Sequence, residues 1–282
     1  MPDFSMIIHN KYNDLTKTQK HVADYLLEHS EVLAFTTLDE LAMQIDVSTT
    51  SVIRLARALG FSGYSDMQKS FQNHFIGSVS LPERFNDALH STKQDQLLID
   101  VFQNDINNIY ATLSALPEKE LSRTVKSIID AEHIYVLGTR GFFSIAYYLV
   151  HRLSQVKENV RLVDGIGMMY PEQLASISPN DICISSLMPR YSKVTANLLS
   201  WLKRKGVKII LITKLGNTEV DSYGDIILPC QIKGASYKNS LVALLSICNY
   251  LLAAVAMQDQ ENARKTIERT EELLKGYYLG TD

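Results

Sequence analysis

The chain has 282 residues, of which 46% are hydrophobic, and its formal net charge is −3. This length favours two domains, and the hydrophobic content excludes global disorder because it is enough to fill two cores. Residues 1–76 hold six Lys or Arg and nine Asp or Glu, whereas the remainder holds 22 of each. The sequence therefore lacks the broad basic field of most nucleic-acid-binding domains, and any contact with DNA has to be local and to depend on pairing of two copies.

The cysteines and the apolar segments indicate the cellular compartment. Cys183, Cys230 and Cys248 lie in apolar surroundings, with neither paired spacing nor the spacing of a zinc site. The apolar run 241–257 is shorter than the ~20 residues that span a bilayer, and the N-terminus has no signal-peptide pattern. We expect buried thiols, a buried helix over 241–257, and a cytoplasmic protein that has no contact with a membrane and needs no metal or cofactor.

Residues 1–76 have the pattern of an all-helical domain. A first helix carries Leu15, Val22, Leu26 and Leu27, and residues 37–61 then form two short helices joined by a tight turn. Asp46 stands at the turn because Asp tolerates a left-handed backbone, and Ser48 or Thr49 can cap the second helix. Apolar residues recur at helical spacing in both helices, namely Leu38, Leu41, Ala42 and Ile45, then Val52, Leu55, Ala56 and Leu59.

The outward face of the second helix has the chemistry of a DNA-reading helix. Short hydroxyl side chains at its start permit close approach to a major groove, and arginines farther along can reach guanine edges or phosphates. An amphipathic helix pair in an ordinary core would show the same apolar spacing. The absence of a carboxylate from this face favours DNA binding by Ser48, Thr49, Thr50, Ser51, Arg54 and Arg57.

The segment after this domain connects it to the rest of the chain. Ser65 can cap a helix that continues through Phe75, and small residues and Pro82 then mark a linker over 77–93. From Glu83 to about Leu116 the helical pattern returns. Its apolar stripe, which either joins the two domains or pairs protomers, is Leu97, Val101, Ile106, Ile109 and Leu113.

Residues 94–282 have the pattern of an α/β domain. Short β-rich runs lie at 133–138, 160–164, 181–186, 207–213 and 225–229. Helical segments separate and follow them, at 118–130, 142–156, from Pro171, at 192–205, from about Asn239 and at 259–276. Strands that alternate with crossover helices predict a parallel sheet flanked by helices on both faces, a Rossmann-like three-layer architecture.

Two loops at the carboxyl ends of predicted strands carry anion-binding chemistry. The first is 138–141, Gly-Thr-Arg-Gly, and the second is 185–192, which runs into a helix with Thr195 in its first turn. Ligands of open parallel sheets lie at this edge, where free N–H groups of helix N-termini favour anions. The glycines also fit a plain tight turn, and the hydroxyls also fit helix caps.

Together the two halves resemble the RpiR/MurR family of bacterial transcription regulators, over about Leu15 to Ala256. The resemblance rests on STTSVIRLARALGFSGYSDMQKSF in the first half, and on GTRGFFSIAYYLVHRL and MPRYSKVT in the second. It implies a helix-turn-helix followed by a SIS (sugar isomerase) domain that senses a phosphorylated sugar and controls genes of its metabolism. It also implies a ligand site of Thr139, Arg140, Gly141, Ser185, Ser186, Arg190, Ser192 and Thr195, with the two arginines as charge partners.

The first loop departs from the common SIS pattern Gly-x-Gly-x-Ser, because Arg140 and Phe142 stand at the second Gly and the Ser. Catalysis is not expected, since SIS isomerases draw a Glu or His from the neighbourhood of residues 233–240 and this chain has neither there. His133 and His151 fit structural roles. The expected partners are operator DNA, a phosphorylated sugar and further copies in a homodimer or homotetramer. The alternatives are a SIS-type isomerase with an accessory helical domain and a protein-interaction module in the first half.

Overall fold

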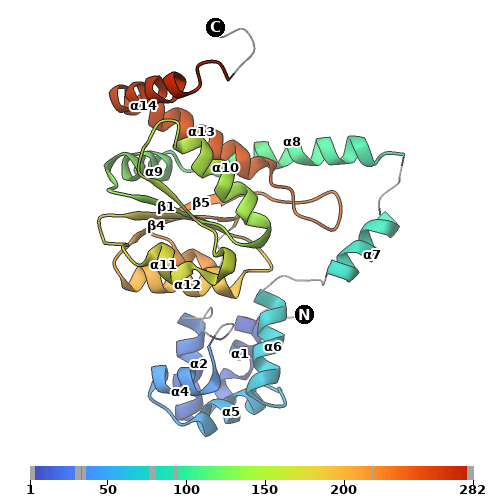
Figure 1. The fold of residues 1–282 in the computed structure, drawn as a ribbon. Coiled ribbons are helices and arrows are strands. Elements are labelled where there is room, and N and C mark those ends of the chain that lie inside the picture. Colours follow the sequence, from blue (N-terminus) through green and yellow to red (C-terminus); the bar gives the residue numbers. More distant parts are fainter. Residues whose placement is uncertain are drawn as a thin grey trace. The chain divides into compact units, whose positions relative to one another are not determined.

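A computed structural model describes residues 4–28, 33, 36–75, 81–91, 95–216 and 219–277. The chain divides into two compact units between residues 83 and 84 (Figure 1). This division falls inside the segment 77–93 that was assigned to a linker, and helix α7 (Leu81–Ser91) occupies part of that segment. Gly77, Ser78 and Ser80 lie outside the described residues, whereas Pro82 stands at the second position of α7.

The first unit is helical around one apolar core. Its elements are α1 (Phe4–Lys11), the 3-10 turn η1 (Tyr12–Asp14), α2 (Lys17–Glu28), α4 (Leu38–Ile45), α5 (Thr49–Ala58) and α6 (Tyr64–Phe75). Helix α1 was not predicted as a separate element, although its Ile8 is fully buried in the core. Ser65 is not the cap that was predicted for α6. The helix starts one residue earlier, and the Asp66 carboxylate accepts hydrogen bonds from the Ser62 N–H and hydroxyl at 2.8 and 3.0 Å.

The second unit contains a five-stranded, entirely parallel sheet in the order β2-β1-β3-β4-β5. The strands are β1 (Ile134–Leu137), β2 (Val160–Val163), β3 (Ile182–Leu187), β4 (Lys208–Lys214) and β5 (Ile226–Cys230). All five predicted strands and the parallel sheet are thus confirmed. Every residue of β1 and β3 is buried, which explains why their sequences are apolar runs rather than alternating patterns.

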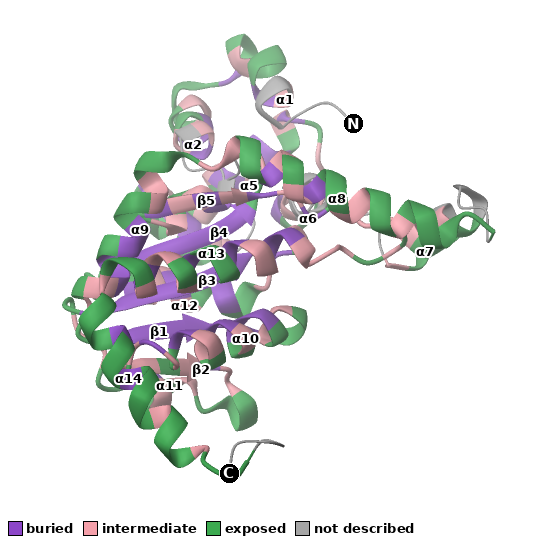
Figure 2. Ribbon diagram, turned by 90° about the horizontal axis from the view of Figure 1, so that it is seen from above, coloured by how far each residue is buried: buried purple, intermediate pink, exposed green. Residues whose placement is uncertain are grey.

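Helices cover both faces of this sheet in a three-layer arrangement (Figure 1). One face carries α8 (Leu97–Ala115), α9 (Glu118–Asp130), α10 (Phe143–Leu153) and α13 (Val242–Gln258), and the other carries α11 (Tyr170–Leu174) and α12 (Lys193–Arg204). Helix α14 (Gln260–Leu273) follows α13, and the 3-10 turns η2 (Arg140–Phe142), η3 (Ile166–Met168) and η4 (Glu219–Tyr223) lie in loops. The buried strands form the centre of the unit in Figure 2.

The predicted buried helix and buried thiols are confirmed. Helix α13 packs in the core through six buried residues, and all three cysteines are free and buried. Burial raises the pKa of each thiol to about 12, so none is a reactive thiolate near neutral pH. Among the described helices, no single one is long and apolar enough to cross a membrane, and α13 passes that test only together with α14, at a bend of 108°.

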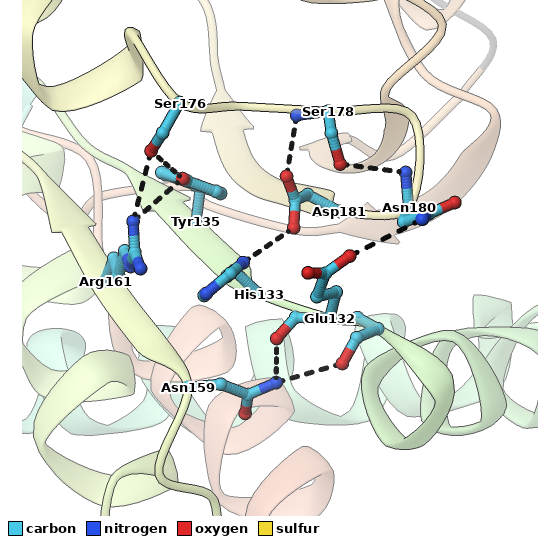
Figure 3. Close-up of polar contacts among 10 residues, drawn as sticks. Glu132, His133, Tyr135, Asn159, Arg161, Ser176, Ser178, Asn180 and Asp181 are labelled. Carbon is cyan, nitrogen blue, oxygen red and sulfur yellow. Dashed lines mark hydrogen bonds and ion pairs between the residues drawn. The ribbon is translucent and has the colours of Figure 1, made fainter.

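Polar side chains close the amino-terminal edge of the sheet (Figure 3). His133 Nδ1 lies 3.0 Å from Asp181 Oδ1, and the other carboxylate oxygen accepts the Ser178 N–H at 2.7 Å. The Asn159 amide donates to the carbonyls of Ala131 and Glu132 at 2.9 and 2.7 Å. These contacts hold the starts of β1, β2 and β3 together and give His133 the structural role that was expected.

Asp181→Asn tests this edge. Burial alone would raise the pKa of the Asp181 carboxyl, but hydrogen bonds from Ser178 and His133 outweigh it and hold the pKa below its usual value. Because this pKa is lower in the folded protein than in the unfolded chain, the ionised carboxylate stabilises the fold at pH values above the unfolded-state pKa. This stabilisation is lost as the pH falls through the folded-state pKa. We expect Asp181→Asn to lower the free energy of unfolding by about 1–3 kcal/mol at pH 7, and the difference from wild type to shrink below about pH 4.

Urea unfolding followed by circular dichroism at both pH values measures this difference. The control is Asp130→Asn, which removes the same charge from an exposed position at the end of α9 and should change stability by less than about 0.5 kcal/mol. Equal losses in the two variants would contradict a specific role of the buried carboxylate.

Candidate DNA-reading helix and ligand-binding loops

The turn between α4 and α5 has the geometry that the sequence predicted. Asp46 adopts a left-handed backbone with φ 58° and ends α4. At the other end of α4, Thr37 and Glu40 form a reciprocal capping box, in which the Glu40 N–H donates to Thr37 Oγ1 and the Thr37 N–H donates to Glu40 Oε2. The capping box at the start of α4 and the left-handed turn at Asp46 fix the orientation of α5 relative to the core of the first unit.

Ser48, rather than Thr49, caps α5. Its hydroxyl accepts the Ser51 N–H at 3.3 Å and lies 2.9 Å from the Ser51 hydroxyl. On the inner side Val52, Leu55 and Ala56 are buried, as predicted. Two of the predicted DNA-contacting hydroxyls therefore already have a local hydrogen-bond partner in the free protein.

The outer side of α5 presents one narrow stripe. Thr50, Arg54 and Arg57 are exposed and are spaced four and three residues apart, so they share one face of the helix. Within the described part of the chain, no ion pair joins either guanidinium to a carboxylate. Lys11 Nζ donates to the Ala58 carbonyl at 3.2 Å, which puts another cation at the carboxyl end of the same helix, a contact that the sequence pattern did not reveal.

In the second unit, the loop after β1 passes close to the helix that follows it. A Cβ atom at Gly138 would lie 2.4 Å from the Ala146 Cβ and 2.8 Å from the Phe142 carbonyl oxygen, so only glycine fits there. Gly141 is different, because a Cβ atom there would meet open space. Ser144, a possible replacement for the missing loop hydroxyl, donates to the Gly141 carbonyl at 2.9 Å.

Three of the predicted ligand hydroxyls meet between this loop and α12. Thr139 Oγ1 lies 2.8 Å from Thr195 Oγ1 and donates to Ser192 Oγ at 3.3 Å. Ser192 also caps α12 by accepting the Thr195 N–H at 3.3 Å. In the sequence, Thr139 is 53 positions from Ser192 and 56 positions from Thr195. The structure brings these three side chains into one cluster at the carboxyl edge of the sheet.

The two serines at the end of β3 have separate environments. Ser185 is buried, and its hydroxyl donates to the Leu137 carbonyl of the neighbouring strand at 3.0 Å. Ser186 points to the opposite face, is 8% exposed, and has no hydrogen-bond partner among the described residues. Ser186 is therefore available to a ligand, whereas Ser185 ties β3 to β1.

The two predicted arginines have strained backbones. Arg140 has φ 51° and Arg190 has φ 69°, both in the left-handed region that L-residues rarely adopt. Both are exposed, and they follow the ends of β1 and β3, which are paired neighbours. Non-glycine residues in strained conformations concentrate at functional sites. The sequence did not reveal this strain, because glycine, the residue that most often adopts a left-handed backbone, stands at neither position.

A third loop, residues 231–241 between β5 and α13, lies against α7 and α8. Asn108 Nδ2 donates to the Lys233 carbonyl at 2.7 Å, and Ser240 Oγ donates to the Asp105 carboxylate at 2.5 Å. A Cβ atom at Gly234 would lie 1.6 Å from the Lys238 carbonyl oxygen, which shows how tightly the loop turns. These contacts of the loop with α7 and α8 were not predicted from the sequence.

Helix α7 contacts the same loop. Arg84 donates from Nη2 to the Asn239 side-chain oxygen at 3.0 Å, and the Phe85 ring meets the Tyr237 ring edge-on with centroids 5.5 Å apart. The part of α7 that belongs to the second unit is therefore attached to a loop at the carboxyl edge of the sheet.

The histidine–carboxylate pair of this unit lies far from the hydroxyl cluster in the fold. His133 and Asp181 are at the amino-terminal edge of the sheet (Figure 3), whereas the hydroxyl cluster is at the carboxyl edge. No hydrogen bond or ion pair joins a described His, Asp or Glu to Thr139, Ser192 or Thr195. The cluster has the groups of an anion-binding site.

These features define a class, a helix-turn-helix regulator with a SIS domain. A family model for the helix-turn-helix domain of the rpiR family matches residues 3–75, and a SIS domain model matches residues 127–257. The chain belongs to the RpiR-type family of transcriptional regulators, which confirms the resemblance seen in the sequence.

Individual relatives agree with this assignment. An HTH-type transcriptional regulator of Haemophilus influenzae is 23% identical over 266 residues, which cover 92% of each chain. The Escherichia coli regulator RpiR is 20% identical over 92% of this chain and 88% of its own. Both are named as transcriptional regulators, in agreement with the expectation that this chain is not an enzyme.

Solved structures give the same fold. The sugar isomerase domain of an RpiR transcription factor from Sphaerobacter thermophilus matches 63% of this chain and 99% of its own, with 26% identity and a TM-score of 0.60. Vibrio vulnificus NanR, solved in complex with ManNAc-6P, matches 99% of this chain and 100% of its own, with 17% identity and a TM-score of 0.57.

Arg190→Gly tests whether the strain at the ligand loop is real. A left-handed L-residue costs roughly 1–2 kcal/mol, and the greater freedom of glycine in the unfolded chain offsets about 0.4–1 kcal/mol of the relief. We expect the free energy of unfolding without ligand to stay constant or to rise by up to about 1 kcal/mol.

The control is Arg264→Gly, which makes the same exchange at an exposed position inside α14 and should destabilise by about 1 kcal/mol. Thermal and urea unfolding measure both variants. A loss at Arg190 as large as the loss at Arg264 would show that the left-handed backbone stores no strain.

Proposed function

We propose that this protein is a sugar-phosphate-responsive transcriptional regulator, which binds operator DNA through α5 and a phosphorylated sugar at the carboxyl edge of its sheet. The ligand proposal rests on the cluster of Thr139, Ser192 and Thr195, together with the two loop arginines whose backbones are left-handed. Hydroxyls, helix N-termini and guanidinium groups are the groups that proteins use to hold phosphate.

Arg140 and Arg190 supply the charge of this site, and Ser186 supplies a free hydroxyl. Arg140 precedes α10 and Arg190 precedes α12, so both stand near the N-terminus of a helix. A phosphate bound at this edge would interact with the N-termini of both helices and with both guanidinium groups. The ligand in the NanR complex, ManNAc-6P, belongs to the same chemical class and supports a phosphorylated sugar as the effector.

The DNA proposal rests on the stripe of Thr50, Arg54 and Arg57. A single unit with a net charge of −3 over residues 1–76 attracts DNA weakly, so two copies in a dimer or tetramer have to read half-sites together. Paired recognition helices meet half-sites about 34–36 Å apart, so a small shift between copies changes affinity. A coupling free energy of about 1–3 kcal/mol between ligand and DNA gives about a 5- to 150-fold response.

Arg54→Ala tests the DNA-reading helix. Loss of one guanidinium contact should weaken operator binding by about 1–3 kcal/mol, or roughly 5- to 150-fold. The measurement is fluorescence anisotropy with an operator fragment selected from genomic DNA, at several salt concentrations. The control is Lys119→Ala, which removes one exposed cation from the sheet unit and should leave affinity unchanged. Equal affinities of wild type and Arg54→Ala at moderate salt would refute the assignment.

Ser186→Ala combined with Arg190→Ala tests the ligand site. A panel of phosphorylated sugars is screened by thermal shift, where a ligand at 100 times its Kd stabilises by about 2.7 kcal/mol. The double variant should lose this shift and the effector response in the DNA assay, yet keep operator binding without ligand. A full thermal shift in the double variant would place the ligand elsewhere, and loss of both activities would indicate misfolding.

A further inference from the structure

The loop between β2 and α11 exposes large apolar side chains at the carboxyl edge of the sheet. Ile166, Met168 and Met169 are 65%, 82% and 51% exposed, and we call these three side chains the apolar rim. No charged residue stands between Asp164 and Glu172. Single exposed apolar residues are common on protein surfaces, whereas several together point to a binding role.

Hydrogen bonds and packing hold this loop in one shape. The Asp164 carboxylate accepts the Ile166 N–H and the Gln173 side-chain N–H, both at 2.9 Å, and the Gly165 N–H donates to Gln173 Oε1 at 3.3 Å. A Cβ atom at Gly165 would lie 1.7 Å from Cζ of Tyr170, so the ring lies directly against the glycine. The exposure of the apolar rim is therefore a consequence of specific local contacts.

The backbone of the loop has the strain that marks the proposed ligand site. Three of the four residues 165–168 are left-handed, and one of them is Met168, with φ 61°. Within the described part of the second unit, the non-glycine residues with a left-handed backbone are Arg140, Met168 and Arg190. They follow β1, β2 and β3, which are neighbours in the sheet. Because such strain concentrates at functional sites, the loop after β2 belongs with the two arginine loops.

The loop starts directly beside the first arginine loop. Strands β1 and β2 pair in parallel, with Leu137 opposite Val163, and the Gly138 N–H donates to the Val163 carbonyl at 3.1 Å. The chain therefore leaves the two strands side by side, toward Arg140 in one loop and toward the apolar rim in the other. In the strand order β2-β1-β3 the apolar rim flanks the proposed phosphate site on one side.

The chemistry of the apolar rim complements that of the phosphate site. Hydroxyls and guanidinium groups recognise phosphate, which all sugar phosphates share, so discrimination among them requires a contact with a part that differs. Ligand sites combine a few polar groups with mainly apolar walls, and methionine side chains adapt to apolar groups of varied shape. Three side chains are too few for a protein interface, which takes about 20–30 residues a side.

We infer that the apolar rim binds an apolar substituent of the effector, which makes the effector a phosphorylated sugar that carries an acyl or alkyl group. The inference rests on the proposed function, because it assigns the far end of a ligand whose phosphate is held by the hydroxyl cluster. A bare sugar hydroxyl would gain little from Ile166, Met168 or Met169, since these side chains have no hydrogen-bond donor.

Binding of matched sugar phosphates tests the inference. The probes are the 6-phosphates of glucosamine, mannosamine and galactosamine, each with an N-acetyl or an N-butanoyl group, together with glucose 6-phosphate. Titration calorimetry on the full chain measures their affinities. In a pair that binds, the butanoyl form has two more CH₂ groups to bury and should bind the wild type about 4- to 15-fold more tightly than the acetyl form.

Ile166→Thr combined with Met168→Gln makes two side chains of the apolar rim polar at similar size. This double variant should bind the acetyl and butanoyl forms equally and should bind glucose 6-phosphate as the wild type does. The matched control is Met257→Gln, the same exchange at a position of α13 that is 70% exposed. It should keep the preference for the butanoyl form.

The outcomes separate this inference from the proposed function. A wild type that binds sugar phosphates but gains nothing from the longer acyl chain would overturn the inference and leave the proposed function intact. A double variant that keeps the preference would do the same. A wild type that binds no phosphorylated sugar at all would refute the proposed function, and the inference with it.

Methionine oxidation locates the contact. Met168 and Met257 are 82% and 70% exposed, so dilute hydrogen peroxide should convert both to the sulfoxide at comparable rates in the free protein. A saturating butanoyl sugar phosphate should slow oxidation of Met168 several-fold and leave Met257 unchanged, as measured by mass spectrometry of peptides. Equal oxidation of Met168 with and without ligand would reject the apolar rim as part of the site. Protection without ligand that grows with protein concentration would assign the loop to a contact between copies instead.

Discussion

The second unit depends on one constraint of a buried parallel sheet, which is that every strand has to begin at the same edge and therefore needs a crossover. After β1 the chain crosses by α10 to β2, and after β3 it crosses by α12 to β4 on the opposite side. The two helices lie on opposite faces of the sheet (Figure 1). The chain enters α10 and α12 from neighbouring strands at the carboxyl edge and then runs to opposite faces of the sheet. The Thr139–Thr195 contact of 2.8 Å joins the loop before α10 to the first turn of α12.

The same edge also meets the segment that leads to the DNA-reading unit. Loop 231–241 touches α7 through Arg84 and Phe85 and touches α8 through Asp105 and Asn108. Loop 231–241 therefore joins the carboxyl end of β5 to the two helices that precede the sheet in the chain, through contacts that lie within the second unit.

The sequence predicted what depends on local patterns. Buried parallel strands appear as apolar runs, and Asp46 and Ser48 have local roles, so their positions could be read directly. The roles of Ser185, Arg140 and Arg190 could not, because they depend on a partner 48 residues away or on a backbone angle. The sequence predicted an apolar stripe on α8 but not its orientation. Leu97, Ile106 and Leu113 of that stripe are exposed, whereas Ile109 packs against the core, and side-chain bonds to residues more than 100 positions away hold the helix in this orientation.

The crossover topology also has a kinetic consequence. In the second unit Ile134 of β1 pairs with Ile182 of β3, so the central strands can meet only after α10, β2 and α11, which lie between them in the chain, have been synthesised. The first unit consists of short helices with nearby partners, and such folds form faster than those with distant strand pairings. It also leaves the ribosome first, and domains generally fold as units during synthesis. We therefore expect α5 to be formed while the sheet is still being synthesised, before the proposed ligand site has formed.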